Sequence, residues 1–176
     1  MITRFLSRRE YAQFASWLKS QDADTLVLYF GIAAGDAMID ALVERIIKSS
    51  DKHYFLIAEQ SGRWLGVVHI ATSDTTVEFG ITVDRDHRGQ GIGSQLIEQA
   101  LIWARNRGYQ ELFMHCLGWN KPIQHLCRKH GLQVRDSYGD YEVTVRLEPP
   151  SPETWWQEIL TAQRNFFNSF YHRIYN

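Results

Sequence analysis

Cysteine is scarce in this chain, which has only Cys116 and Cys127 among 176 residues. Two cysteines are too few for a disulfide framework, and this pair does not have the Cys-x-x-Cys spacing of a zinc site. The seven histidines are scattered rather than set in a ligand pattern. The sequence therefore predicts no metal site.

Net charge and long apolar runs are lacking as well. The formal net charge is −1 and the isoelectric point is about 6.6, which argues against nucleic acid or an anionic membrane as a partner. No run of about 18 apolar residues could span a bilayer, and the first ten residues, MITRFLSRRE, do not contain the apolar core of a signal peptide. We therefore expect a cytoplasmic protein. Its 44% hydrophobic content is enough for one well-packed domain.

Strand and helix patterns alternate along the chain without an internal repeat. Strand patterns occupy 2–6, 54–59, 64–71, 76–83 and 111–117, and a closing hairpin is expected at 134–147. Helical spacing follows Ser7, Asp36, Gly93 and Asn120, of which Ser7, Asp36 and Asn120 can cap their helices. An apolar and aromatic run at 26–30 ends at Gly31.

Three glycines, Gly89, Gly91 and Gly93, stand just before a helical pattern, where glycine costs stability. A P-loop would continue with Gly-Lys-Ser/Thr, but Gly93 is followed by Ser94-Gln95. A dinucleotide fingerprint needs a third glycine where this chain has Leu96. What remains is bare backbone whose N–H groups converge at a helix N-terminus, and such a site favours a phosphate or pyrophosphate.

The segment VEFGITVDRDHRGQGIG, residues 77–93, places a strand, a short turn, a glycine loop and a helix in this order. Arg88, Gly91 and Gly93 match the pattern Arg/Gln-x-x-Gly-x-Gly/Ala, and Asn120 is followed by LCRKHGL. In these features residues 2–148 resemble the GNAT acyltransferases, whose pattern binds the pyrophosphate of acetyl-CoA.

The resemblance implies an α/β fold with a twisted, mixed and mostly antiparallel sheet flanked by helices. The strands at 76–83 and 111–117 would be parallel and splay apart, and the wedge between them would receive acetyl-CoA, the acetyl donor. The backbone of Ile81, Thr82 and Val83 would pair with the pantetheine arm as with an added strand. The pyrophosphate would be held by Arg88 and by the loop N–H groups of Gly89, Gln90, Gly91, Ile92, Gly93 and Ser94. Asn120 would contact the cofactor, cap its helix, or do both.

Acetyl transfer to an amine needs a base, because an alkyl ammonium has a pKa of about 10.4 and must lose a proton before it attacks. The resemblance implies Glu78 for this role, against the alternative of a solvent-facing strand glutamate. His115 in the facing strand is the second candidate. Many members of the family have a tyrosine that protonates the leaving thiolate, and Cys127 stands in its place here. Its thiol could donate a proton, but a buried packing role is the favoured interpretation.

The acceptor is expected to be a primary amine, either a small molecule or a protein lysine. The stretch LYFG, residues 28–31, resembles the substrate side of the branch that includes protein lysine acetyltransferases, and LCRKHGL without tyrosine also resembles that branch. A second interpretation keeps the fold and drops the chemistry, which would make the chain a CoA-binding regulatory or scaffold module.

Three of the four prolines, at 149, 150 and 152, mark a boundary between a domain at 1–148 and a C-terminal helix within 149–176. Apolar and aromatic residues recur there every three or four positions: Trp155, Trp156, Ile159, Leu160, Phe166, Phe167, Phe170, Tyr171 and Ile174. Such a face should pack on its own domain, on a second copy in a homodimer, or on a membrane, and the few basic residues nearby disfavour the membrane.

Overall fold

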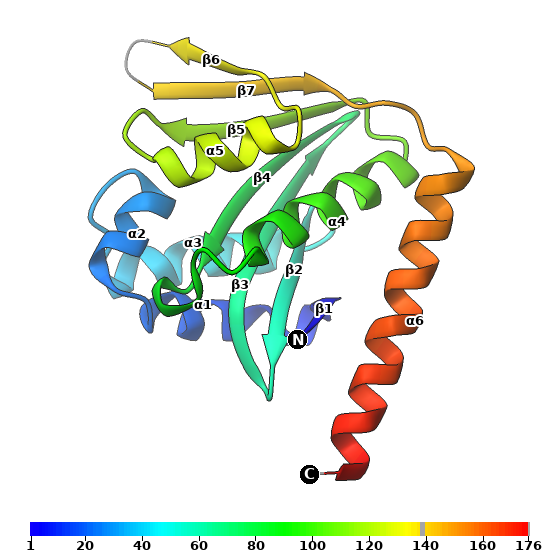
Figure 1. Cartoon of the computed structure of the whole chain (residues 1–176). Coiled ribbons are helices and arrows are strands. Elements are labelled where there is room, and N and C mark those ends of the chain that lie inside the picture. The colour runs from blue at the N-terminus through cyan, green and yellow to red at the C-terminus, as the bar shows by residue number, and fades with distance from the viewer. Residues whose placement is uncertain (138–139, 176) are drawn as a thin grey trace.

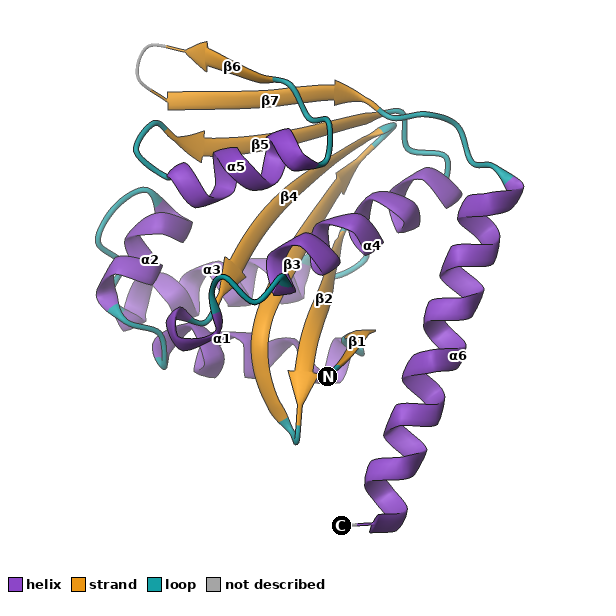
Figure 2. Ribbon diagram, viewed as in Figure 1, coloured by secondary structure: helices purple, strands orange, loops and turns teal. Residues whose placement is uncertain are grey.

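The computed structural model describes residues 1–137 and 140–175. For residues 116, 134–137, 140–141 and 166–175 it describes the backbone alone. A seven-stranded sheet in the order β1-β2-β3-β4-β5-β7-β6 carries helices on both faces (Figures 1 and 2). The strands are β1 (Ile2–Phe5), β2 (His53–Gln60), β3 (Arg63–Ser73), β4 (Thr76–Val83), β5 (Glu111–Leu117), β6 (Val134–Ser137) and β7 (Asp140–Arg146). The helices are η1 (Arg8–Glu10), α1 (Tyr11–Lys19), α2 (Ala23–Phe30), α3 (Asp36–Lys48), η2 (Arg85–His87), α4 (Ile92–Asn106), α5 (Lys121–Lys129) and α6 (Pro152–Tyr175).

The expected fold class is confirmed, and two local details differ from the expectation. The apolar run at 26–30 lies in helix α2, which begins when the Asp22 carboxylate accepts a hydrogen bond from Thr25 N–H (3.1 Å). Gly35 caps α3, so Asp36 is the first helical residue and not the cap. A carboxylate in the first turn still favours the helix there, because it faces the positive end of the helix dipole.

Two apolar cores hold the helices against the sheet, one on each face. Helices α1 and α3 cover one face, and their shared cluster includes Phe14, Ile39 and Phe55. Helix α4 covers the other face through Leu96, Ile97 and further residues. Successive residues of β4 face opposite sides of the sheet. Val77 and Phe79 are buried towards α4, while Glu78 and Gly80 lie on the opposite face.

The parallel pair β4 and β5 is short. Thr76, Val77 and Glu78 pair with Glu111, Leu112 and Phe113, and no further pairs follow. The two strands diverge beyond that point (Figure 2), which confirms the expected splay. The backbone from Phe79 to Val83 therefore has a strand partner on the β3 side only.

The last helix docks on its own domain, beside α4 and β1 (Figure 1). Its docking contacts are polar. Asn106 at the end of α4 donates to the Thr154 carbonyl (3.1 Å) and accepts from Thr154 Oγ1 (2.6 Å), while its amide also meets Glu158 Oε2 (2.6 Å). Further along the helix, the Asn165 side chain bonds the backbone of Thr3.

The apolar residues at the start of α6 face away from the domain. Trp155, Trp156, Ile159 and Leu160 are 50%, 63%, 44% and 58% exposed. The stripe expected from the sequence therefore does not form the docking face in this part, and the members of the stripe from Phe166 to Ile174 have side chains outside the described residues. Within residues 1–137 and 140–175, neither α6 nor any other helix combines the length and the apolar character needed to cross a membrane.

The polar docking of α6 makes a stability prediction. Replacing Asn106 with alanine should lower the free energy of unfolding by about 2 kcal/mol, because the buried Thr154 loses its two hydrogen bonds to Asn106 and Glu158 loses one of its partners. Urea unfolding of the full chain measures the effect, and Gln157→Ala on the exposed side of α6 is the control. Equal stability of the two variants would contradict docking through Asn106.

Candidate active site

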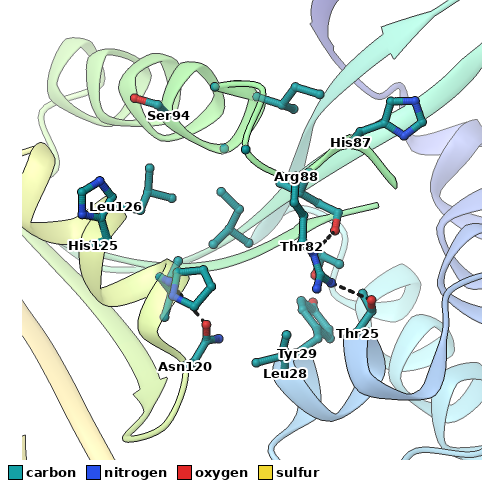
Figure 3. A pocket seen from close by; sticks show the side chains of 18 of the residues that line it. Thr25, Leu28, Tyr29, Thr82, His87, Arg88, Ser94, Asn120, His125 and Leu126 are labelled. Carbon is teal, nitrogen blue, oxygen red and sulfur yellow. Dashed lines mark hydrogen bonds between the residues drawn. The ribbon is translucent and has the colours of Figure 1, made fainter. Parts of the chain in front are cut away.

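A cavity of about 510 Å³ lies where β4 parts from β5. Its walls come from α2, the free end of β4, the glycine loop with the start of α4, and α5 (Figure 3). The residues that line it are Thr25, Leu28, Tyr29, Ile81, Thr82, Val83, His87, Arg88, Gly89, Gly91, Ile92, Gly93, Ser94, Asn120, Pro122, Ile123, His125, Leu126 and Lys129.

One wall of the cavity is the free edge of β4. Ile81, Thr82 and Val83 lie beyond Glu78, the last residue of β4 that pairs with β5. Such an edge presents backbone N–H and C=O groups that need partners. Among the described residues, the buried Thr82 Oγ1 also has no hydrogen-bond partner. This wall suits a ligand that carries amide groups and lies along the strand.

The glycine loop forms a second wall at the N-terminus of α4. Gly89 and Gly91 adopt left-handed backbone angles, with φ of +75° and +81°, which favour glycine. Gly91 is the N-cap, so the N–H groups of Ile92, Gly93 and Ser94 have no acceptor within the helix. Space around Gly89 and Gly91 is open. The loop can therefore bring several N–H groups and the helix dipole to an anion.

Close packing also favours glycine at position 93. A Cβ at this position would lie 3.4 Å from Leu126 of α5 and 3.6 Å from Val83 of β4. Absence of a side chain thus lets the start of α4 sit close to both other walls of the cavity. Gln90, the remaining expected loop residue, is exposed, does not line the cavity, and bonds the Asp86 carbonyl through its side chain (3.3 Å).

Arg88 ties the loop to two other elements. Its Nε donates to the Val83 carbonyl (3.1 Å), and a terminal nitrogen donates to Thr25 Oγ1 (2.6 Å) in α2 (Figure 3). Thr25 Oγ1 in turn donates to Asp22 (2.5 Å). The guanidinium lines the cavity and holds the loop in place, and its expected salt bridge to a pyrophosphate stays a prediction.

The turn that leads into the loop is fixed by Asp84. Its carboxylate accepts from Arg63 (2.9 Å) and from Asp86 N–H (3.1 Å). Burial acts to raise the pKa of Asp84, but the hydrogen bonds and the charge of Arg63 prevail and hold that pKa below its usual value. Asp84 is therefore ionised at neutral pH and anchors η2 next to the end of β4.

Helix α5 supplies the fourth wall. The Asn120 side chain accepts from Ile123 N–H (3.3 Å) and lines the cavity, so it caps the helix and can also meet a ligand. Sequence reasoning missed His125 and Lys129, although their spacing of four puts both on one face of the helix. It also missed His130, whose Nε2 bonds Ser94 Oγ (2.8 Å) and whose pKa burial lowers.

The three expected catalytic residues lie outside the cavity wall. Glu78 is exposed at the end of the paired part of β4, on the same face as Gly80. His115 is exposed on β5 opposite Glu142. Cys127 is fully buried in the core under α4, which agrees with the packing interpretation. Of the three, Glu78 stands nearest in the fold to the point where the strands part.

The comparison with protein families gives one match, and it spans most of the cavity wall. The model described as "Acetyltransferase (GNAT) family" matches residues 14–132 of this chain. This range is more than half of the chain and includes α2, the end of β4, the glycine loop and α5.

Relatives and solved structures agree with that match. YwnH of Bacillus subtilis strain 168, a phosphinothricin acetyltransferase by name, is 43% identical over 56 residues, which are 32% of this chain and 34% of that protein. The match thus spans only about a third of that relative. The GNAT domain of PAT from S. lividans has a TM-score of 0.71 at 19% identity, over 82% of this chain and 89% of that one. Phosphinothricin acetyltransferase from Sinorhizobium meliloti, solved with AcCoA, has a TM-score of 0.65 at 13% identity, over 85% and 92% of the chains.

The left-handed cap of α4 makes a binding prediction. An alanine at Gly91 is strained by roughly 1–2 kcal/mol at positive φ, so the loop should relax and the affinity for coenzyme A should fall about tenfold. Gly35→Ala is the matched control, because Gly35 also caps a helix in open space but has a negative φ. Titration calorimetry with coenzyme A compares the two, and equal affinities would count against the loop as the anion site.

Proposed function

This chain belongs to the GNAT acetyltransferase family, and on that premise we propose that it is an acetyl-CoA-dependent N-acetyltransferase acting on a primary amine. The observation that carries the proposal is the convergence of two features on one cavity. The free edge of β4 with the unpartnered Thr82 Oγ1 forms one wall, and the N-terminus of α4 with its bare loop forms the next.

These walls fit the two chemically different parts of coenzyme A. The loop N–H groups of Gly89–Ser94 would hold the pyrophosphate, with Lys129 adding positive charge from α5. The edge at Ile81–Val83 would hydrogen-bond the amides of the pantetheine arm, and Thr82 Oγ1 would gain a partner there. Asn120 would contact the cofactor from the cap of α5.

Bound acetyl-CoA supplies an activated acetyl group as a thioester. The Glu78 carboxylate would take the proton from the acceptor ammonium at its Oε atoms, directly or through a water, and release it to solvent because the side chain is exposed. His115 is the second candidate for this role. A backbone N–H near Val83 would donate to the carbonyl oxygen as negative charge develops on it.

The acceptor is a primary amine, either a small molecule or a protein lysine. Leu28 and Tyr29 of the LYFG stretch line the cavity from α2, which supports an acceptor that approaches on the α2 side of β4. YwnH and the Sinorhizobium meliloti structure are both named as phosphinothricin acetyltransferases, and these names support a small-molecule amine as the acceptor. A screen of polyamines, amino acids and lysine peptides with acetyl-CoA, read by mass spectrometry, identifies the class.

The base role of Glu78 is tested with Glu78→Gln. We expect its kcat to fall about 100-fold while its affinity for coenzyme A stays unchanged, because the amide keeps the shape of the side chain and cannot take the proton. Thiol release from acetyl-CoA measures kcat, and Glu44→Gln on the exposed face of α3 is the control. His115→Gln tests the second candidate in the same assay.

The outcomes separate the two interpretations of the fold. Binding of coenzyme A by wild type and Glu78→Gln, with thiol release by neither, would contradict the enzymatic proposal and support a CoA-binding module. Equal turnover by wild type and Glu78→Gln would contradict the role of Glu78 as the base and would leave the enzymatic proposal standing.

We also propose that two copies of the chain pair through the exposed apolar face of α6. Trp156 and Leu160 are four residues apart and lie on this face, where they are more than half exposed. Leu160→Glu should shift the mass in solution, measured by light scattering, from dimer to monomer. The control Gln157→Glu adds the same charge at an exposed position about 100° around the helix from Trp156, and it should leave the mass unchanged. A monomeric wild type would overturn this pairing.

A further inference from the structure

Tyr29 lies at the point where β4 leaves β5, on the face of the sheet that α2 covers. Its ring packs over Gly80, where an added Cβ would be 3.3 Å from Tyr29 Cε2 and 3.6 Å from the hydroxyl oxygen. Gly80 is two residues beyond the last pair between β4 and β5, and Tyr29 lines the cavity (Figure 3). The hydroxyl therefore lies beside Gly80, between Glu78 and the free edge of β4 at Ile81–Val83.

Two histidines continue from the Tyr29 hydroxyl across the neighbouring strands β3 and β2, on the same face of the sheet. His69 on β3, the register partner of Gly80, has its Nδ1 3.4 Å from Tyr29 Oη. Its other nitrogen, Nε2, is 3.0 Å from Nδ1 of His53 on β2. His53 is only partly buried, and its ring stacks on that of His69 with centroids 5.1 Å apart. The three side chains form one hydrogen-bonded row that begins at the cavity.

Each member of the row is neutral at physiological pH. Burial, together with the nearby His53, lowers the pKa of His69 to about 3. Burial and the charge of Arg45 on α3 also lower the pKa of His53, against the effect of Asp51, while Lys52 lowers it further. Burial and the charge of Glu78 raise the pKa of the Tyr29 hydroxyl. A neutral imidazole donates with one nitrogen and accepts with the other, so the row can be hydrogen-bonded in either direction.

We propose that Tyr29 gives its hydroxyl proton to the sulfur of the departing coenzyme A and that His69 and His53 return a proton to it. The inference rests on the proposed acetyl transfer. The C–N bond forms, the C–S bond breaks, and the electron pair of the C–S bond stays on sulfur, which takes the proton from Tyr29 Oη.

The proton count closes through the row. Tyr29 Oη takes the proton of His69 Nδ1, His69 Nε2 takes that of His53 Nδ1, and His53 takes one from solvent at Nε2. All three groups stay neutral, so no phenolate forms at a place where burial disfavours one. The amine nitrogen loses two protons to solvent through Glu78, so the reaction of an ammonium releases one proton overall.

Other donors on the cavity wall are less suited to this step. The hydroxyls of Thr25 and Ser94 are bonded to Asp22 and His130, and aliphatic hydroxyls are much weaker acids than a phenol. His87 and His125 stand on other walls, beside the glycine loop and on α5 (Figure 3).

The test compares Tyr29→Phe and His69→Phe with a matched control, Tyr11→Phe. Tyr11 also loses a hydroxyl next to His53, since its Oη donates to the His53 carbonyl (2.6 Å), but it lies outside the row. We expect kcat to fall about 100-fold in Tyr29→Phe and about tenfold in His69→Phe. Tyr11→Phe should keep the kcat of wild type, and all three variants should bind coenzyme A as tightly as wild type.

A second readout uses the protein without ligand. Nitrogen NMR of ¹⁵N-histidine should show His69 neutral at pH 7, with its Nδ1 signal shifted in Tyr29→Phe and unshifted in Tyr11→Phe. A kcat of Tyr29→Phe within twofold of wild type, an equal loss in Tyr11→Phe, a loss of coenzyme A binding in Tyr29→Phe, or an unmoved His69 signal would each overturn the proposal. Absence of any acetyl transfer by wild type would instead contradict the proposed function.

Discussion

The parting of β4 from β5 after three residue pairs is the constraint on which the site depends. Backbone groups that leave a sheet need new partners, and most strands meet this need with water or a covering element. Here the exposed edge turns towards a cavity whose next wall is a helix N-terminus. One ligand can satisfy both walls only if it carries amides at one end and an anion at the other, and coenzyme A has this composition.

Helix α2 connects the two ends of this arrangement. Thr25 near its start receives Arg88 and so holds the glycine loop, while Tyr29 near its end packs over Gly80 of β4. Because α2 contacts both places, it fixes the distance between the glycine loop and the part of β4 where the proposed acetyl transfer would occur. This dual contact explains why a short helix of eight residues, capped by Asp22 and ended by Gly31, lies against the free end of β4.

Local patterns in the sequence predict the fold and most of the residues that line the cavity. The glycine loop, the strand at 76–83 and the Asn120 cap all follow from neighbours in the chain. The contacts that sequence reasoning missed join distant residues, such as Tyr29 with His69 and Ser94 with His130. No spacing rule links them, because strand order decides which histidine meets which hydroxyl. The docking face of α6 was not predicted for a related reason. The helix contacts α4 and β1 through polar side chains, and the apolar stripe in that part of the helix faces away from the domain.

Amide hydrogen exchange with and without coenzyme A tests the central claim most directly. The account predicts slower exchange on binding at two separate places, the β4 edge at Ile81–Val83 and the start of α4 at Ile92–Ser94. The exposed turn at Ser61-Gly62 between β2 and β3 should be unchanged. Binding of coenzyme A that slows exchange at neither place would contradict the account.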